Sequence, residues 1–432
     1  MKIGFLSVFN FGSNIGGVEN HIYFMARALQ KRGHEIIIFQ PIESTNPENE
    51  IKIIDGIKIC LIGIRPLRLV GFFNRFNGVK LIGFGTAFLN KAKFLIYRKR
   101  IAKVIREHRP DIIHQHDFIS NIFTTKAICQ EIPCVLTNHT GEYLFFQKSK
   151  IGRYLLKKLL SHFRYIIGPS RQLTPLEYNE NSKTIHNGVD SVFFNGNFDK
   201  GEVRKRLGFK PDEFIILCPR RWAPTKGVIY LMRAVHNVGL DSKFRFLFAG
   251  SDYDGYPGYR EEIMKTLGHM PHRECVILLG NLSVHDIVDY YRAADLVVIP
   301  SLMEAVSLAA IESMACGTPV LSTNVGGMPE LIKNGKNGLM VNPADPSALA
   351  DSIRYLSRDT KTYQQIARKS IQTAARYSWD GIAEQTEDIY EKALDSNPKK
   401  ATSRLLRLKS KKGTEKDEEF AKKSEFEEIS AH

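Results

Sequence analysis

Short apolar runs rich in β-branched residues alternate with helix-like segments along this chain, and that alternation limits its fold more than any other feature. The first two runs are KIGFLSVFN (2–10) and HEIIIFQ (34–40), and the segment between them has the spacing of an amphipathic helix. Two strands joined by a helix pair in parallel, because a parallel pair needs a long crossover connection. The pattern continues at residues 110–117, 133–139 and 164–170. We therefore predict a parallel α/β sheet for this half.

A second series of the same kind begins with EFIILCPR (213–220). It continues at residues 244–251, 275–281, 295–301 and 318–324. The 432 residues are more than one hydrophobic core usually organises. We therefore predict an α/β protein of two doubly wound, Rossmann-like domains that face each other across a cleft.

These patterns divide the chain into four parts. We expect an N-terminal domain over residues 1–190 and a C-terminal domain over residues 191–375. Residues 376–396 are predicted to form a terminal helix that packs back toward the N-terminal domain. The segment 397–432 is dense in charge and poor in bulky apolar residues, so we expect it to be disordered.

Positive charge is concentrated in the N-terminal half. Residues 1–188 hold 27 Lys and Arg against 13 Asp and Glu, in a chain whose net charge is +15. Such a field attracts lipid headgroups, nucleic acid or a phosphorylated substrate, although solubility alone is the competing interpretation. IGRYLLKKLLSHFRYII (151–167) has the pattern of a cationic amphipathic helix, which suits either an anionic membrane surface or packing on a sheet.

The cysteines and apolar runs indicate a cytoplasmic protein. The six cysteines are scattered without a CxxC pair, which favours reduced thiols over disulfides or a zinc site. The opening MKIGFLSVFN has too short an apolar run for a signal peptide, and no apolar run reaches the ~18 residues of a membrane span. We expect a cytoplasmic protein that contacts the inner face of a membrane peripherally.

Two glutamates, Glu304 and Glu312, stand in the apolar run SLMEAVSLAAIESMACGTPV (301–320). Glu304 falls in the loop after a predicted strand, where ligands bind in such sheets, and Ser307 is placed to cap the helix that follows. At about 1.5 Å of rise per residue, the two carboxylates are about 10 Å apart or more, too far for a retaining glycosidase pair.

The helix start between these acids is a predicted anion site. Its backbone N–H groups come from Val306, Ser307 and Leu308. Such an element suits a ligand that has a diphosphate in the middle and a hydroxylated ring at each end. A charged residue flanking a buried helix is the alternative interpretation.

The run MEAVSLAAIESMACGTPVLSTNVGGMPELI (303–332) resembles the E-x7-E donor signature of the family 4 retaining glycosyltransferases (glycosyl transferases group 1), which have the GT-B fold. The similarity extends over residues 1–395. It implies that Glu304 contacts hydroxyls of the donor sugar and that Glu312 holds the ribose hydroxyls of the nucleotide. Members usually carry Gly-Phe after the first glutamate, where this chain has Ala305-Val306.

PRRWAPTKG (219–227) resembles a second element of the same family. The resemblance implies that Arg221 and Lys226 are its Arg/Lys pair on the donor diphosphate, with Arg220 a near-equal candidate for the arginine. Two cations at the end of a strand can neutralise phosphate charge as the leaving group departs. A solvated basic loop is the alternative.

Two segments of the N-terminal half also match the family. The glycines Gly16 and Gly17 of GGVENH let backbone approach a ligand closely, and the resemblance implies that donor diphosphate and acceptor meet there. The loop is not a GxGxxG sequence, so a nicotinamide dehydrogenase is not expected. His139, in TNHTGEY, matches the family's histidine near the donor sugar.

Two other patterns have metal-site alternatives. His114 and His116 share one face of a predicted strand, but without a third clear ligand we favour a packing or cleft-lining role. Asp252-Tyr253-Asp254 has the DxD pattern by which another glycosyltransferase fold holds a metal, yet Asp and Gly are also favoured in turns. We expect no obligatory metal and no cofactor besides the donor.

The expected activity is that of a retaining hexosyltransferase acting from a nucleotide-diphosphate sugar. The expected acceptor is a lipid-linked saccharide or glycolipid in cell-surface glycan synthesis, bound by the N-terminal half. A nucleotide-sugar epimerase or hydrolase on the same fold is one alternative. A basic nucleic-acid-binding protein is another, but the chain has no recognisable RNA or DNA motif, so we expect no nucleic-acid partner.

Overall fold

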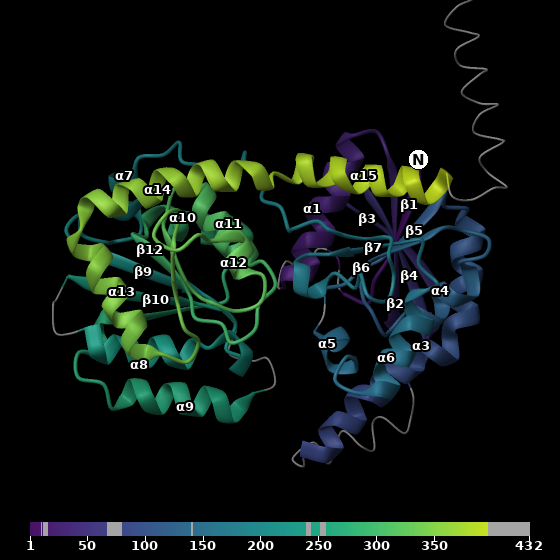
Figure 1. The fold of residues 1–432 in the computed structure, drawn as a ribbon, viewed down its shortest axis with the longest axis horizontal. Coiled ribbons are helices and arrows are strands. Elements are labelled where there is room, and N and C mark those ends of the chain that lie inside the picture. Colours follow the sequence, from purple (N-terminus) through teal and green to yellow (C-terminus); the bar gives the residue numbers. More distant parts are fainter. Residues whose placement is uncertain are drawn as a thin grey trace, which may run out of the picture.

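Two α/β units lie side by side in the computed structural model, which describes residues 1–9, 11, 16–66, 80–139, 141–238, 243–250 and 256–395 (Figure 1). For residues 80–92 and 257 it describes the backbone alone. Helices α14 (Thr360–Ala374) and α15 (Trp379–Asp395) run along one side from the C-terminal unit to the N-terminal unit. The predicted α/β class with two doubly wound units is confirmed.

The N-terminal unit is built on an eight-stranded sheet with the order β3-β4-β2-β1-β5-β6-β7-β8. Neighbouring strands are parallel except β3 and β4, which are antiparallel. The strands are β1 (Lys2–Leu6), β2 (Glu35–Glu43), β3 (Asn49–Ile54), β4 (Ile57–Ile64), β5 (Ile112–Gln115), β6 (Cys134–Thr137), β7 (Tyr165–Gly168) and β8 (Ser182–Thr184). The helices are α1 (Gly17–Lys31), α3 (Lys80–His108), α4 (Ile122–Ile128), α5 (Glu142–Phe146) and α6 (Lys150–Leu160).

The C-terminal unit has a six-stranded parallel sheet with the order β11-β10-β9-β12-β13-β14. Its strands are β9 (Phe214–Pro219), β10 (Phe244–Ala249), β11 (Val276–Gly280), β12 (Leu296–Ile299), β13 (Val320–Thr323) and β14 (Leu339–Val341). Its helices are α7 (Lys200–Arg206), α8 (Val228–Val238), α9 (Pro257–Gly268), α10 (Val284–Ala293), α11 (Leu308–Ala315), α12 (Met328–Leu331) and α13 (Pro346–Arg358).

Both sheets are covered by helices on both faces, which explains why their strands read as continuous apolar runs. One face of the N-terminal sheet packs on α1 and α15, and the other on α3, α4 and α6. The C-terminal sheet packs on α8 and α13 with one face and on α10 and α11 with the other. Strand order reverses between β1 and β5 in one sheet and between β9 and β12 in the other, so both sheets have a ligand-binding switch point.

The prediction of one helix over 151–167 is wrong. Helix α6 ends at Leu160, and β7 begins at Tyr165. The buried face of α6 carries Leu156 and Leu160, whereas Leu155 is 38% exposed. Phe163 and Ile166 are buried for a different reason, because they belong to the turn and the strand that follow.

Candidate functional site

A cavity of about 380 Å³ lies between the two units, beside the loops that leave their central strands. The start of α1 and the loop after β6 contribute to its N-terminal wall. The loops after β9 and β12 and the start of α11 form much of its C-terminal wall. Every residue that the sequence analysis assigned to catalysis or donor binding lines this cavity: Gly16, Gly17, His139, Arg221, Lys226, Glu304, Val306, Ser307, Leu308 and Glu312.

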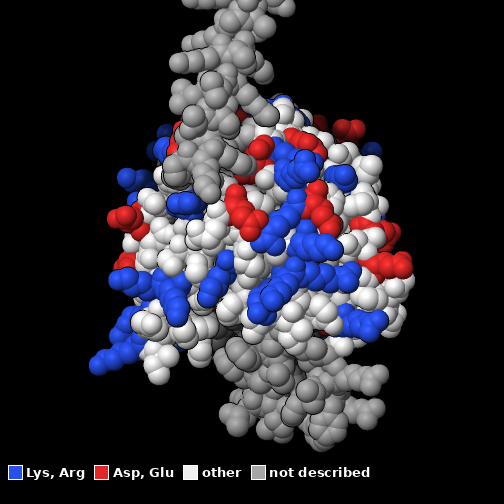
Figure 2. Space-filling view, turned by 90° about the vertical axis from the view of Figure 1, so that its right-hand side faces the viewer, with Lys and Arg blue, Asp and Glu red and all other residues white. Residues whose placement is uncertain are grey.

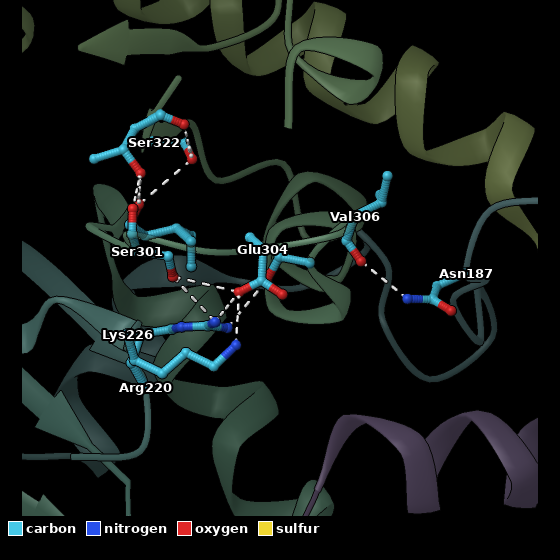
Figure 3. A network of polar contacts seen from close by, with 10 residues as sticks. Asn187, Arg220, Lys226, Ser301, Glu304, Val306 and Ser322 are labelled. Atoms are coloured by element: carbon cyan, nitrogen blue, oxygen red, sulfur yellow. Dashed lines mark hydrogen bonds and ion pairs between the residues drawn. The ribbon is translucent and has the colours of Figure 1, made fainter. Parts of the chain in front are cut away.

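Glu304 is the centre of an ion-pair network on the C-terminal wall (Figure 3). Its Oε2 contacts Arg220 Nη2 and accepts a hydrogen bond of 3.1 Å from Lys226 Nζ. Ser301 Oγ lies 3.3 Å from the same carboxylate oxygen and accepts a hydrogen bond of 3.1 Å from Arg220 Nη2. The side chains of Glu304 and Arg220 are only 12% and 9% exposed, so these charges interact with little screening by water.

The neighbouring charges decide the protonation of this network. Burial alone would raise the pKa of Glu304, but the positive charges of Arg220 and Lys226 outweigh it and lower that pKa to about 2. Burial, together with the charge of Arg220, lowers the pKa of Lys226 to about 8 even though Glu304 opposes the shift. At neutral pH, Glu304 is therefore a carboxylate and most of Lys226 is charged.

The N-terminus of α11 reaches the same cavity. Ser307 occupies its N-cap position, but the side chain makes no capping hydrogen bond. The Ser307 hydroxyl instead accepts a hydrogen bond of 3.2 Å from Arg220 Nη1, so the expectation that Ser307 caps the helix is wrong. The first N–H groups of α11 are therefore not capped by Ser307 and can bind an anion.

Glu312 lies in the second turn of α11, after the loop that carries Glu304. Its Oε2 accepts a hydrogen bond of 2.8 Å from the hydroxyl of Tyr291, a buried residue of α10. Burial raises the pKa of Glu312 to about 7, although the Tyr291 hydrogen bond and the charge of Arg220 both lower it. Both protonation states are therefore populated near neutral pH, and a ligand that donates hydrogen bonds favours the carboxylate.

The first turns of α1 and α11 converge across the cavity. A methyl group in place of the α-hydrogen of Gly17 would lie 3.8 Å from Cδ1 of Leu308. Asn187 bridges the units at the same level: its Nδ2 donates a hydrogen bond of 2.9 Å to the carbonyl oxygen of Val306 (Figure 3). Two helix N-termini facing one space create a positive potential that favours an anionic ligand.

His114, His116 and His139 of the N-terminal unit take two different roles. His114 is fully buried, with ring nitrogens 2.6 Å from the hydroxyls of Tyr390 and Thr137, which matches the packing role favoured for it. His116 Nδ1 instead lies 3.2 Å from Nε2 of His139, the cavity-lining histidine. Burial lowers the pKa of all three histidines well below the ordinary value, so they are neutral at pH 7.

Sequence reasoning missed several residues of this site. Tyr291, Asn187 and Ser301 carry no local pattern that distinguishes them from other polar residues. Gly326 did carry a signal, since it is the first of two adjacent glycines in the 303–332 motif. Its φ is +52°, and a Cβ there would lie 1.7 Å from the carbonyl oxygen of Glu304. This glycine therefore allows the backbone contact that supports the Glu304 loop.

Two of the sequence predictions lie outside the described residues, namely the Asp252-Tyr253-Asp254 pattern and the 397–432 tail. Within the described segments, no helix combines the length and the apolar character needed to cross a bilayer.

Two family models match this chain and overlap only slightly. The model for glycosyl transferases group 1 matches residues 199–373, and the model for Glycosyltransferase Family 4 matches residues 15–219. The two matches correspond closely to the C-terminal and N-terminal units of the fold.

Similar proteins cover nearly the whole chain. An uncharacterized glycosyltransferase of Methanocaldococcus jannaschii is 28% identical over 407 residues, which are 88% of this chain and 95% of the relative. The D-inositol 3-phosphate glycosyltransferase of Acidothermus cellulolyticus is 26% identical over 416 residues, covering 90% of this chain and 88% of that protein. Among solved structures, Anabaena HepE in complex with UDP-glucose superposes with a TM-score of 0.69 at 20% identity, covering 90% of this chain and 98% of that one.

Proposed function

The chain belongs to the glycosyl transferases of group 1 and family 4 and has their GT-B fold, and we propose that it transfers a hexose, with retention of anomeric configuration, to a lipid-linked saccharide or glycolipid. The observation that carries this proposal is the order of groups along the C-terminal wall of one cavity. Glu304 and its two cations come first, the start of α11 lies between, and Glu312 follows. A nucleotide-diphosphate sugar presents hydroxyls, two phosphates and hydroxyls in the same order.

The donor is proposed to lie with its diphosphate at the start of α11. Backbone N–H groups of Val306, Ser307 and Leu308 would bind phosphate oxygens there. The ribose hydroxyls would donate hydrogen bonds to Glu312, which the Tyr291 hydroxyl holds in place. The sugar would extend toward Glu304, with His139 on the facing wall.

The ion pairs of Glu304 give this donor a defined electrostatic role. Arg220 and Lys226 are held at the cavity by one carboxylate oxygen, so they are already oriented before a substrate arrives. A donor diphosphate carries more negative charge than this carboxylate and competes for the same cations. As it takes them over, Glu304 becomes available to accept hydrogen bonds from sugar hydroxyls.

Retention is supported by the composition of the facing wall. Its described residues are Gly16, Gly17, Val18, Asn20, His139, Pro169 and Asn187, and none of these has a carboxylate. A retaining reaction without a carboxylate nucleophile requires the acceptor to attack from the face that the phosphate leaves. The bond from C1 to the acceptor oxygen forms as the bond from C1 to the phosphate oxygen breaks, and the acceptor proton passes to that phosphate. Arg220 and Lys226 then stabilise the departing diphosphate.

The lipid-linked acceptor is proposed because the N-terminal unit has a basic and apolar surface. Phe145, Ile151 and Tyr154 on α5 and α6 are 57%, 75% and 66% exposed. Lys150, Arg153, Lys157 and Lys158 are exposed on α6 beside them. Figure 2 shows Lys and Arg side chains gathered on the end of the molecule that this unit forms. Exposed apolar side chains among cations are typical of peripheral contact with an anionic bilayer.

Product analysis tests the proposed reaction. The full chain is incubated with a nucleotide sugar, chosen by thermal shift from a panel, and a membrane extract as the source of acceptor. We expect a glycolipid product whose anomeric proton shows the configuration of the donor, and an inverted product would contradict retention. A parallel incubation without acceptor distinguishes the alternatives, because an epimerase or hydrolase would convert the donor at the same rate in both.

A further inference from the structure

Three histidines from separate segments of the N-terminal unit meet beside the cavity. His21 comes from α1, His116 follows β5 and His139 follows β6. One ring nitrogen of each lies within 4.8 Å of the corresponding nitrogen of the other two. The centroids of the His21 and His139 rings are 4.5 Å apart, and those of His116 and His139 are 5.5 Å apart. Of the two histidines in the HxH pattern, only His116 belongs to this group, and His139 and His21 supply the two further imidazoles that a metal site needs.

The hydrogen bonds of Asn187 fix the tautomer of His21. The Asn187 amide nitrogen donates to the carbonyl of Val306, which can only accept, so its Oδ1 faces His21 Nδ1 at 3.0 Å. Nδ1 of His21 therefore carries the proton and Nε2 has the lone pair. This Nε2 is buried without a hydrogen-bond partner among the described residues, on a side chain that is 3% exposed. A buried lone pair oriented by a carbonyl on the opposite ring nitrogen is the arrangement of a metal-binding histidine.

The other two histidines have a separation that suits one metal ion. His116 Nδ1 and His139 Nε2 are 3.2 Å apart. Two nitrogens bound at 2.0–2.1 Å to one tetrahedral Zn²⁺ are separated by about 3.3 Å. The remaining separations, of up to 4.8 Å, would have to shorten by up to about 1.5 Å, through rotation of the partly exposed His139 ring and small shifts of the buried His21 and His116 rings.

We propose that His21, His116 and His139 form a binding site for a divalent transition-metal ion, with Zn²⁺ the best match. Three neutral imidazoles suit Zn²⁺ and exclude Mg²⁺ and Ca²⁺, which prefer oxygen ligands. His139 lines the cavity, so the fourth position opens toward it and takes a water molecule. In the metal-free chain one proton lies between His116 Nδ1 and His139 Nε2. When both of these nitrogens bind the ion, the ring that carries this proton holds it on its other nitrogen instead.

Occupation of this site has a consequence for the proposed transfer reaction. An ion on His139 removes that side chain from the donor sugar and places a cation and its water in the acceptor side of the cavity. Zn²⁺ therefore inhibits transfer. Binding itself does not depend on the proposed function, whereas the inhibition does.

Binding is measured on the full chain, freed of metal with a chelator and titrated with ZnCl₂ by calorimetry in the absence of any sugar nucleotide. We expect one ion per chain, with affinity reduced at least about 100-fold by His21→Ala and by His116→Ala. Asn187→Ala should reduce it about tenfold, because the hydrogen bond that orients the His21 ring is lost. Co²⁺ bound in the same site should give the intense visible absorption of a tetrahedral ion. His236→Ala and His285→Ala, at exposed positions, are the matched controls.

The outcomes separate the two parts of the proposal. No binding, or binding that both histidine variants retain, overturns the site. X-ray absorption of the Zn²⁺-loaded wild-type chain covers the case in which a variant does not fold: three imidazole ligands support the site, and oxygen or sulfur ligands overturn it. Transfer that continues unchanged with the site filled overturns the inhibition alone, and if no transfer is found at all, the proposed function fails while the binding result stands.

Discussion

Lys226 Nζ lies 3.1 Å from Oε2 of Glu304, the carboxylate oxygen that Arg220 also contacts. The Glu304 carboxylate thus positions two cations beside the N-terminus of α11. A buried ion pair of this kind contributes little net stability, because desolvation offsets most of the attraction. It does keep both cations oriented and concentrated where a diphosphate is proposed to bind.

Replacing Glu304 by Gln should separate donor binding from transfer. The neutral amide no longer competes with phosphate for Arg220 and Lys226, so a nucleoside diphosphate should bind as tightly as to the wild type or more tightly. The amide orients sugar hydroxyls poorly, and transfer should fall on the order of 100-fold. Calorimetry and a radiolabel transfer assay measure the two quantities. Weaker binding in this variant would show that the carboxylate is part of the phosphate site.

The two adjacent arginines should differ sharply. Arg220 contacts Glu304, Ser301 and Ser307 and is nearly buried, whereas Arg221 is an exposed residue of the cavity rim. Arg220→Lys keeps a positive charge but loses the fork that binds several oxygens, so kcat should fall about tenfold or more. Arg221→Lys should change kcat less than threefold. If Arg221→Lys instead lowers kcat more than Arg220→Lys in a steady-state assay, the diphosphate is bound by Arg221, as the sequence analysis expected.

Donor affinity should increase with pH across the neutral range. Ribose hydroxyls donate to the ionised form of Glu312, and its pKa is raised to about 7 by burial, so a proton must leave before the donor binds at lower pH. The dissociation constant should fall about sixfold from about pH 6 to about pH 7.5, since each pH unit below the pKa of Glu312 costs a factor of about ten. It should rise again above pH 8, where Lys226, whose pKa is lowered to about 8, loses its charge. Calorimetry measures this with an intact nucleotide sugar. A nucleoside diphosphate is unsuitable, because its terminal phosphate itself titrates near about pH 6.

Two variants of this wall serve as controls for the pH dependence. Glu312→Gln should bind the donor weakly and with no such dependence. Tyr291→Phe removes a hydrogen bond that lowers the pKa of Glu312, so the rise in affinity should move to higher pH. An unchanged profile in both variants would place the titrating group elsewhere.

Reversal of charge on α6 should strongly weaken vesicle binding. The triple variant Lys150→Glu, Arg153→Glu, Lys157→Glu removes cations worth about 1 kcal/mol each near an anionic surface, so affinity for phosphatidylglycerol vesicles should fall on the order of 100-fold. Co-sedimentation measures binding, and transfer to a water-soluble acceptor should persist. Lys361→Glu with Arg368→Glu and Lys369→Glu, at exposed positions of α14, is the control matched in charge. Equal loss in both variants would indicate only a general effect of net charge.

Much of the fold was predictable because buried parallel strands carry a strong local signal. Runs such as IIIF and LVVI are apolar at every position, and β2 and β12 were located to within a few residues. The hairpin of β3 and β4 was missed, although its turn at Asp55-Gly56 has the positive φ angles of 49° and 77° that this dipeptide favours. The exposed pattern of β3 hid it, since five of its six residues face solvent.

Site residues that belong to a sequence motif could be predicted. Residues that reach the site only through the tertiary fold could not. Glu304, Glu312 and Lys226 were expected at the site because they lie in segments that resemble the family's donor-binding motifs. The partners Tyr291 and Asn187 come from segments 21 and 119 residues away from the groups they bind, and no sequence spacing indicates such contacts. The choice between Arg220 and Arg221 likewise depends on which side chain the end of β9 directs toward Ser307.

The most direct test of the donor site is a crystal structure of the full chain with a non-hydrolysable nucleotide sugar selected by thermal shift. The predicted complex has ribose hydroxyls on Glu312, the diphosphate against the start of α11 with Arg220 and Lys226, and the sugar beside Glu304. A nucleotide sugar bound outside this cavity, or one bound with Glu304 still paired to both cations and far from the sugar, would contradict the account.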